Sequence, residues 1–428
     1  MPQFAFQESN ERIGAAEEHL RGTLNQRLET NMRILYVTIG FPYPLTSGYL
    51  RHYFYIRGLS ERHKVTLLSW VGRNFQSEHA EALTPFTTQV LTFGDGVARR
   101  SKLREAWRVC RALVPGVGLD RGLEEMQVAV GRCLRQEPFD VVLFSGKRPP
   151  VIAGVRDVPL VVDMCDATSM GIRGRMRYCG PARLLPLCLE YLQMRRVERR
   201  LLRQASHLLF ASCRDRDALL GRVNARTSII PNGVDLDYWR RQSTERGRDT
   251  IVMTGAMDYA PNRDAALYLV EEVLPRVRRS VPGARLIIVG RDAPSKLIHA
   301  AQRAGACVTG FVEDVRPYLE QATVSAAPLR FGAGIQNKLL EAMAMGVPVV
   351  ASPLAAEGLR TEDGEAPPIA VAGTPEEFAD LIVQRLVEAR RDPAPSIEVR
   401  RFVEQNFVWS SSTAKLERVM ASLIGRSG

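Results

Sequence analysis

The chain has 428 residues, of which 45% are hydrophobic and 25% charged, and its 58 Lys+Arg against 47 Asp+Glu give a formal net charge of +11. This length predicts two domains with separate cores, while the seven cysteines lack the CxxC pairs and spacing of a metal site. No apolar run reaches the roughly 18 residues that span a bilayer, so we expect a cytoplasmic protein with reduced thiols.

The predicted first domain covers residues 32–228 and follows a polar extension at 1–31. This extension lacks the basic region followed by an apolar core that is typical of a secretory signal. It opens with an apolar strand, a turn, a helix and a second strand over 32–70, which together indicate a βαβ unit. Gly48 lies in the turn and His52 on the helix. Both are candidates for the acceptor side of a substrate cleft, and the alternative for His52 is a core histidine. A dinucleotide-binding fingerprint would need the sequence GxGxxG in this turn. The turn contains one glycine, which argues against NAD binding.

Basic residues gather in the first half of the chain. Residues 1–231 hold 34 Lys+Arg against 22 Asp+Glu, which leaves 24 against 25 in the remainder. In the densest segments, 98–111 and 172–203, arginines alternate with apolar side chains. This pattern suits the anionic inner face of the plasma membrane or a lipid-diphosphate acceptor, and solvated arginine-rich helices explain it equally well. Nucleic acid is not an expected partner, because no helix-turn-helix, zinc-finger or RNA-binding signature accompanies the charge.

Two aspartates follow a later strand of the first domain. Strands are expected at 139–144, 160–163 and 207–212, and the second of them leads into Asp163 and Asp166. Open α/β sheets bind ligands at the carboxyl ends of their parallel strands, so both carboxylates are acceptor-side candidates. Each could instead cap a helix.

The segment IIPNGVD at 229–235 combines a short strand with a Pro-Asn-Gly turn, and it indicates the crossing into a second domain predicted at 229–395. Asp235 and Asp237 form a DxD sequence, but they lie in this turn rather than at a strand end facing phosphates, so capping is the better interpretation. Strands beginning near residues 251, 286, 307, 324 and 347 then alternate with helices, which predicts a doubly wound parallel sheet.

The most informative run is 327–352, read as a loop, a helix and a strand. Gly332 and Gly334 permit a tight turn and a close approach of the backbone to a ligand. The following helix directs its unpaired amides to the same place, so an anion is expected there. Lys338 and Glu341 share one helix face, where the ammonium can neutralise a diphosphate and the carboxylate can accept bonds from ribose hydroxyls. A surface ion pair would explain these two residues alone, but the glycine loop before them favours a sugar-nucleotide site.

Five motifs follow one another in the second half: IIPNGVDLDYW at 229–239, IVMTGAMDYAPN at 251–262, LIIVGRD at 286–292, VTGFVEDVRPYL at 308–319 and GIQNKLLEAMAM at 334–345. Together they resemble the donor-binding half of glycosyltransferase family 4, retaining enzymes of the GT-B fold. The last motif looks most like sugar transferases encoded with bacterial exopolysaccharide-export and exosortase systems. The resemblance implies an α/β protein of two Rossmann-like domains with doubly wound parallel sheets facing a cleft. It also implies that residues 396–428 form a C-terminal crossover helix that returns to the first domain.

The resemblance also implies roles for single residues. Lys338, Glu341 and Asp163 become catalytic candidates. The implied donor-binding residues are Gly255, Arg263, Arg291, Phe311, Val312, Gly332, Ala333, Gly334, Ile335, Lys338 and Glu341. The family usually has another glutamate eight residues before Glu341, where this chain has Ala333, so the amides of residues 333–335 are expected to take over part of the sugar recognition. Relatives of this fold work without metal, so neither a metal ion nor another cofactor is expected.

These features predict the transfer of a sugar, with retention, from a nucleoside diphosphate to a hydroxyl of a lipid-linked or exopolysaccharide glycan. The main catalytic task is then to stabilise the diphosphate leaving group. Two alternatives remain. One is a sugar-nucleotide epimerase on the same fold, which needs neither an acceptor nor a basic face. The other is a nucleotide-binding, non-catalytic subunit of a polysaccharide assembly complex.

Overall fold

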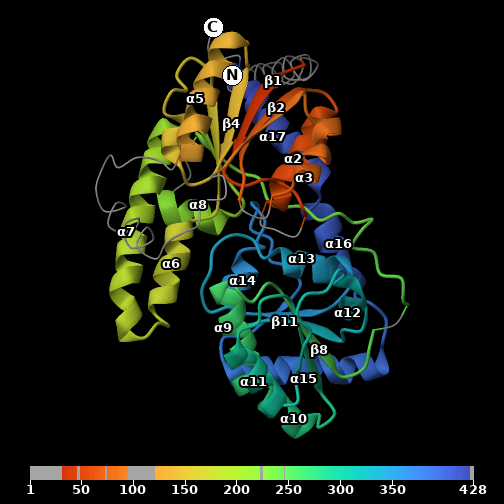
Figure 1. Ribbon diagram of the computed structural model, residues 1–428. Helices are drawn as coiled ribbons and strands as arrows, with labels where there is room; N and C mark the ends of the chain where they lie inside the picture. The colour runs from red at the N-terminus through yellow and green to blue at the C-terminus, as the bar shows by residue number, and fades with distance from the viewer. Residues whose placement is uncertain are drawn as a thin grey trace, which may run out of the picture.

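A computed structural model describes residues 31–45, 49–72, 75–94, 121–221, 225–244 and 246–424. Over these residues the chain forms two lobes, each built on one parallel sheet covered by helices (Figure 1). The first sheet has seven strands in the order β3-β2-β1-β4-β5-β6-β7, and the second has six in the order β10-β9-β8-β11-β12-β13. The predicted α/β architecture of two doubly wound parallel sheets is confirmed.

The first domain alternates strands with helices. Its strands are β1 (Arg33–Thr38), β2 (Lys64–Trp70), β3 (Gln89–Phe93), β4 (Val141–Ser145), β5 (Leu160–Cys165), β6 (His207–Phe210) and β7 (Thr227–Ile229). Its helices are α2 (Leu50–Ser60), α3 (Ser77–Glu81), α5 (Arg121–Gln136), α6 (Thr168–Met176), α7 (Pro181–Gln204) and α8 (Cys213–Leu220), with short 3-10 turns at Thr84–Phe86 and Pro149–Ile152.

The second domain repeats this alternation. Its strands are β8 (Thr250–Thr254), β9 (Arg285–Val289), β10 (Cys307–Val308), β11 (Val324–Ala327), β12 (Val349–Ala351) and β13 (Ala370–Val371). Its helices are α9 (Ala260–Tyr268), which continues through a π turn at Leu269–Val273 into α10 (Leu274–Ser280), then α11 (Ser295–Arg303), α12 (Arg316–Glu320), α13 (Asn337–Ala344), α14 (Pro353–Glu357), α15 (Pro375–Arg391) and α16 (Ile397–Asn406).

Side chains of the first sheet alternate between two cores. Along the central strand β1, Leu35 and Val37 belong to one buried cluster, whereas Ile34 and Tyr36 belong to the other. This division follows from the two-residue period of a strand whose two faces are both covered. A parallel sheet sends its carboxyl ends to one edge, so the turns after β4, β5 and β6 lie together there, next to the second domain (Figure 1).

The last helix, α17 (Trp409–Ile424), returns to the first domain, as expected. Trp409 and Leu416 lie in the same buried cluster as Ile34, and the Trp409 ring stacks on Phe54 with 4.8 Å between ring centroids. The preceding helix α16 packs instead in the core of the second domain through Val399 and other apolar residues.

The two crossings between the domains touch each other. Val234 on the way out pairs with Val408 on the way back, and a side chain at Gly233 would come within 2.4 Å of the Trp409 nitrogen. Only a residue without a Cβ therefore fits this crossing. Among the described helices, none has both the length and the apolar character required to cross a membrane.

Candidate functional site

The glycine loop connects β11 to α13. Gly332 has φ +142° and Gly334 has φ +74°, backbone conformations that residues with a Cβ rarely adopt. The turn between β8 and α9 lies against this loop, because a Cβ built on Gly332 would be 3.8 Å from Pro261 and 4.0 Å from the Tyr259 hydroxyl. The loop and this turn both follow carboxyl ends of neighbouring strands in the second sheet, which is where such sheets bind ligands.

Lys338 and Glu341 lie half-buried on the first turns of α13. The Lys338 ammonium donates to Oδ1 of Asn262, whose Nδ2 donates to the Ala256 carbonyl at 2.9 Å. Burial lowers the pKa of Lys338 to about 8, and the nearby Glu341 carboxylate opposes this shift. Burial also raises the pKa of Glu341 to about 7, opposed by Lys338. Both groups therefore change charge near neutral pH, within reach of a ligand at the glycine loop.

Asn262 packs closely against Gly255, one of the predicted donor-binding residues. A Cβ built on Gly255, which has φ +144°, would approach Nδ2 of Asn262 to 2.6 Å. The glycine thus leaves room for the amide that holds Lys338. Sequence reasoning found Gly255 and Lys338 but missed Asn262, although it lies inside the quoted motif at 251–262.

A second amide pair links the domains. Asn232, in the crossover turn, donates from Nδ2 to Oδ1 of Asn337 at 2.8 Å, and Asn337 immediately precedes Lys338. From the first domain, Arg51 donates to Oδ1 of Asn232 at 3.0 Å and to the Ile230 carbonyl at 2.7 Å. The beginning of α13 is therefore connected to α2 through hydrogen bonds that the sequence did not reveal.

Two of the acceptor-side candidates lie in the interior of the first domain. The Asp163 side chain is fully buried and accepts from Nε of Arg51 at 2.8 Å. Both ring nitrogens of His52 are also engaged, with the Tyr36 hydroxyl at 2.7 Å and the Ser145 hydroxyl at 2.9 Å, and burial lowers its pKa to about 4. In this structure neither Asp163 nor His52 faces the cleft, which corrects their predicted placement. Gly48 lies outside the described residues.

Asp166 is the acceptor-side candidate that faces the glycine loop. A Cβ built on Gly334 would lie 3.4 Å from its Cβ, although the two residues belong to different domains. Its carboxylate accepts from the Thr168 hydroxyl at 2.6 Å and lies 4.0 Å from the Lys147 ammonium. The side chain is 36% exposed, and burial of the remainder raises its pKa. Asp166 thus offers a partly accessible carboxylate beside the loop.

The remaining donor-side candidates line the same edge of the second sheet less tightly. Arg263 donates to the Met257 carbonyl at 3.3 Å, and Arg291 lies 3.4 Å from the neighbouring Asp292. Phe311 is 66% exposed, whereas Val312 packs against the core of the second domain. The exposed ring of Phe311 is therefore accessible for contact with a planar group such as a nucleobase.

The crossover aspartate Asp235 accepts from the backbone N–H groups of Asp237 at 3.2 Å and Tyr238 at 3.0 Å. This is the capping geometry expected for the DxD sequence. Among the described residues, no three His, Cys, Asp or Glu side chains gather in a way that could hold a metal ion.

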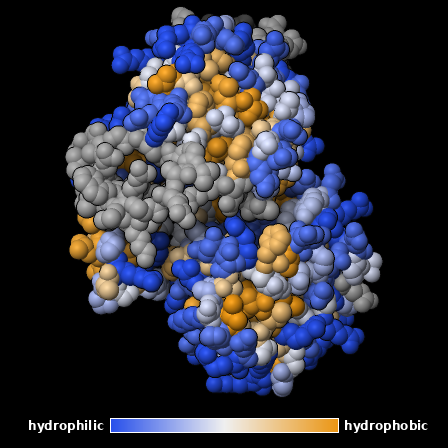
Figure 2. Space-filling view, viewed as in Figure 1, coloured by the Kyte–Doolittle hydropathy of each residue, from blue (hydrophilic) through white to orange (hydrophobic). Residues whose placement is uncertain are grey.

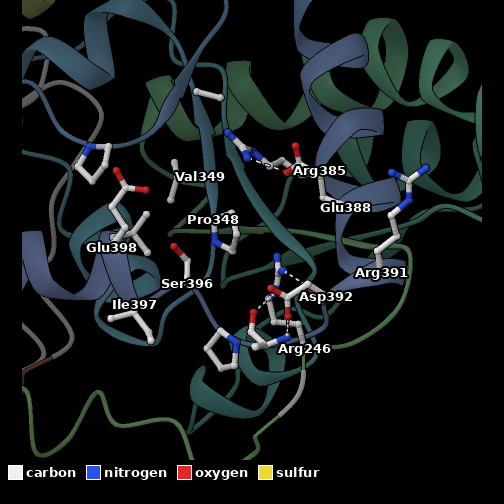
Figure 3. Close-up of a pocket in the computed structure, with 15 residues that line it drawn as sticks. Arg246, Pro348, Val349, Arg385, Glu388, Arg391, Asp392, Ser396, Ile397 and Glu398 are labelled. Carbon is white, nitrogen blue, oxygen red and sulfur yellow. Dashed lines mark hydrogen bonds and ion pairs between the residues drawn. The ribbon is translucent and has the colours of Figure 1, made fainter.

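A pocket of about 620 Å³ opens elsewhere on the second domain (Figure 3). Its wall includes Pro348 and Val349 at the amino end of β12, the opposite edge of the sheet from the glycine loop. Arg246, also in the wall, donates to the backbone carbonyls of Asp392 and Ala394 at 2.9 Å. None of the predicted site residues lines this pocket, so it is separate from the candidate site.

Comparison with known proteins adds a family match for the second domain. Residues 248–388, within the second domain, match the family described as glycosyl transferases group 1. A phosphatidyl-myo-inositol mannosyltransferase of Mycobacterium tuberculosis is 29% identical over 212 residues, which cover 46% of this chain and 54% of that protein. The enzyme of the same name from Mycobacterium leprae is 31% identical over 205 residues, covering 44% and 52%. The chain therefore spans about half the length of the curated relatives that it matches.

Solved structures match almost the whole chain. Anabaena Alr3699/HepE in complex with UDP-glucose superimposes with a TM-score of 0.63 at 14% identity, covering 92% of this chain and 100% of that one. Sucrose-phosphate synthase from Thermosynechococcus elongatus gives a TM-score of 0.66 at 15% identity with the same coverage. At these identities the likeness shows the fold, two Rossmann-like domains of the GT-B type.

Proposed function

We propose that the chain is a retaining glycosyltransferase that moves a sugar from a nucleoside diphosphate to a hydroxyl of a lipid-linked or exopolysaccharide glycan. The observation that supports this most is the placement of Lys338 and Glu341 directly after the glycine loop, inside the segment that matches glycosyl transferases group 1. One half-buried cation and one carboxylate beside backbone amides are the groups needed for a diphosphate and a ribose.

The main catalytic task is to stabilise the charge that develops on the leaving group. Breaking the anomeric bond leaves negative charge on the diphosphate, and the Lys338 ammonium, fixed by Asn262, lies where it can stabilise that charge. The amides at the beginning of α13 add a partial positive charge. In a retaining transfer the departing phosphate can take the acceptor proton on the same face, so a protein nucleophile is not needed. Lys338 therefore carries most of the leaving-group stabilisation, and the reaction is expected to need no metal.

On the acceptor side we assign contact with the substrate to Asp166 rather than to Asp163. The Asp166 carboxylate is partly exposed and faces Gly334, with Lys147 at 4.0 Å as its cationic neighbour. Asp163 acts indirectly, because it holds Arg51, and Arg51 in turn holds Asn232 in the crossover turn. A carboxylate beside an ammonium can accept a bond from an acceptor hydroxyl while staying ionised.

We also propose that α6 and α7 contact an anionic membrane. These helices lie side by side as an arm of the first domain beside the second, and apolar and hydrophilic side chains are mixed on the surface there (Figures 1 and 2). Residues 168–204 hold nine arginines against two glutamates. Large apolar side chains of α7 are exposed on this arm, namely Leu184 (44%), Leu185 (70%) and Leu192 (50%). Basic and apolar groups together suit an anionic lipid surface, and the names of the mycobacterial relatives contain a phosphatidylinositol.

The transferase proposal is tested by calorimetry and thermal shift of the purified protein with UDP-, GDP-, ADP- and dTDP-sugars, with and without Mg²⁺. We expect one sugar nucleotide to bind and stabilise the protein selectively, by about 2.7 kcal/mol at a concentration of 100 Kd, whether or not Mg²⁺ is present. Incubation of that donor with a glycan acceptor should then release the nucleoside diphosphate. Binding without any transfer or hydrolysis would instead support the non-catalytic subunit, and no binding at all would overturn the donor site.

A further inference from the structure

The backbone of Gly334 is held from the first domain through both its N–H and its carbonyl group. Its N–H donates to the Asp215 carboxylate, at 3.1 Å from Oδ2 and 3.3 Å from Oδ1. Its carbonyl accepts from a terminal nitrogen of Arg214 at 3.4 Å. Arg214 and Asp215 are neighbours at the beginning of α8, so one turn of the first domain binds both backbone polar groups of one residue of the donor loop.

This turn is itself firmly fixed. The Asp215 side chain is 2% exposed and also accepts from the Ser212 hydroxyl at 2.5 Å and from the Ala167 N–H at 3.0 Å. Arg214 donates from its other terminal nitrogen to the Leu354 carbonyl of the second domain at 2.6 Å. A buried carboxylate with several donors has little freedom to move, so the position of the Asp215 carboxylate sets that of Gly334.

Helix α6 packs against the same loop. A Cβ built on Gly171 would lie 3.6 Å from the Ala333 Cβ, and one built on Gly174 would lie 2.9 Å from the Phe331 Cβ. The Tyr178 ring stacks on Phe331 with 5.8 Å between centroids. Glycine weakens a helix by roughly 0.5–1 kcal/mol relative to alanine, and at Gly174 it permits Phe331 to approach α6 more closely than a Cβ would allow.

Asp215 also changes how the loop can meet an anion. The sequence suggested that the Gly334 amide recognises the donor sugar, but in this structure that amide is used by a carboxylate of the protein. Asp215 is paired with Arg214 at 3.6 Å, so it is the occupied N–H of Gly334, rather than a net charge, that leaves Lys338 as the group to meet a phosphate.

We propose that Arg214 and Asp215 are positioning residues through which the first domain sets the conformation of the donor loop. The identity of the ligand rests on the proposed function, whereas the contact of Arg214 and Asp215 with Gly334 does not depend on it. Donor binding then depends on how the two domains are docked, since separating them would release both the N–H and the carbonyl of Gly334. The donor diphosphate is directed toward Lys338 because the carboxylate occupies the Gly334 amide.

The test combines hydrogen exchange with donor titration on the full chain. The variants are Arg214→Gln and Asp215→Asn, and the control is Asp217→Asn on the same helix, whose side chain is 51% exposed and pairs with Arg216. In Arg214→Gln and Asp215→Asn we expect the amides of residues 331–336 to exchange at least about fivefold faster, whereas the control should match the wild type. Unchanged exchange in both variants would overturn the proposal.

Donor titration then separates positioning from simple support of the fold. With the sugar nucleotide that the wild type binds, both variants should show a KM for the donor raised about fivefold or more, with a smaller change in kcat, at temperatures where circular dichroism shows them folded. Faster exchange of the loop with an unchanged donor KM would overturn the positioning role. If the wild type binds no sugar nucleotide, the proposed function fails, while the exchange experiment still decides whether the first domain holds the loop.

Discussion

The Arg51 guanidinium and the Asp163 carboxylate form an ion pair, 2.8 Å from Nε to Oδ2, in which neither side chain is more than 1% exposed. Arg51 has further bonds to Asn232 and to the Ile230 carbonyl, so the pair fixes the point where the chain leaves the first domain. The two residues are 112 positions apart in the sequence. Their contact explains why an aspartate at the carboxyl end of a parallel strand is not exposed to the cleft.

Removing one partner of this ion pair should strongly destabilise the first domain. We expect Arg51→Met to lower the free energy of unfolding by about 3–5 kcal/mol, because it leaves the Asp163 charge buried without its cation. Urea unfolding followed by circular dichroism measures this. Arg121→Met is the control, since Arg121 is 89% exposed in its pair with Glu125 and should cost less than about 1 kcal/mol. Equal effects of the two changes would contradict the assignment.

The sequence was sufficient for the parts of the protein that depend on local pattern. Alternation of strands and helices predicted both parallel sheets, and the glycines before α13 predicted a tight turn, in which Gly334 has φ +74°. Lys338 and Glu341 were identified because they share a face of one short helix. Each of these inferences uses residues fewer than about ten positions apart.

The remainder depends on contacts between distant residues. His52 and Asp163 were chosen because one follows the Gly48 turn and the other ends a parallel strand. Their burial depends on Tyr36 and Arg51, which no spacing rule connects to them. Asn262 was missed because an amide gives no signal of its own until the ammonium that it binds is in place. The Asp215 contact with Gly334 joins two domains over 119 positions, which a reading along the chain does not reveal.

Replacing Lys338 by a neutral side chain of similar size should weaken the donor site without harming the fold. We expect Lys338→Met to raise the donor Kd by about 10- to 100-fold, because a hydrogen bond to a charged group contributes about 1.5–3 kcal/mol. The fold should survive, since burial already disfavours this ammonium, as its lowered pKa shows. Calorimetry measures the Kd, with Lys296→Met at an exposed position as the control. An unchanged Kd in Lys338→Met would remove this residue from the site.

Donor affinity should pass through a maximum near neutral pH. Lys338 is charged below its pKa of about 8, and Glu341 is ionised above its pKa of about 7, so both have their binding form between these values. Affinity should fall above about pH 8 as the ammonium loses its proton, and below about pH 7 as the carboxylate gains one. Calorimetry from about pH 5.5 to 9.5 measures this. The alkaline decline should disappear in Lys338→Met and the acidic one in Glu341→Gln, and a flat profile in the wild type would contradict both roles.

The close packing of α6 on the donor loop can be tested with one methyl group. Gly174→Ala places a Cβ 2.9 Å from that of Phe331, so α6 or the loop must shift. Although alanine favours a helix by about 0.5–1 kcal/mol, we expect the donor Kd to rise several-fold and the stability not to increase. Gly154→Ala is the control, because nothing lies within 4 Å of its added Cβ. A Gly174→Ala protein with unchanged Kd would show that the contact does not matter for the donor site.

Membrane contact by the α6–α7 arm should depend on its exposed leucines. Leu184 and Leu185 are 44% and 70% exposed and lie next to Arg183 at the beginning of α7. We expect the wild type to co-sediment with vesicles of phosphatidylcholine and phosphatidylglycerol more than with phosphatidylcholine alone. Replacing both leucines by serine should reduce binding about tenfold or more, because each buried leucine contributes about 1.5–3 kcal/mol.

Ile397→Ser, at a 72% exposed position of the second domain, is the control and should bind the vesicles as the wild type does. High ionic strength should weaken binding of the wild type to the anionic vesicles, because salt screens the charges of the arginines. If the double variant binds the anionic vesicles as well as the wild type, the arm is not the contact surface, and if the wild type binds none, the membrane proposal fails.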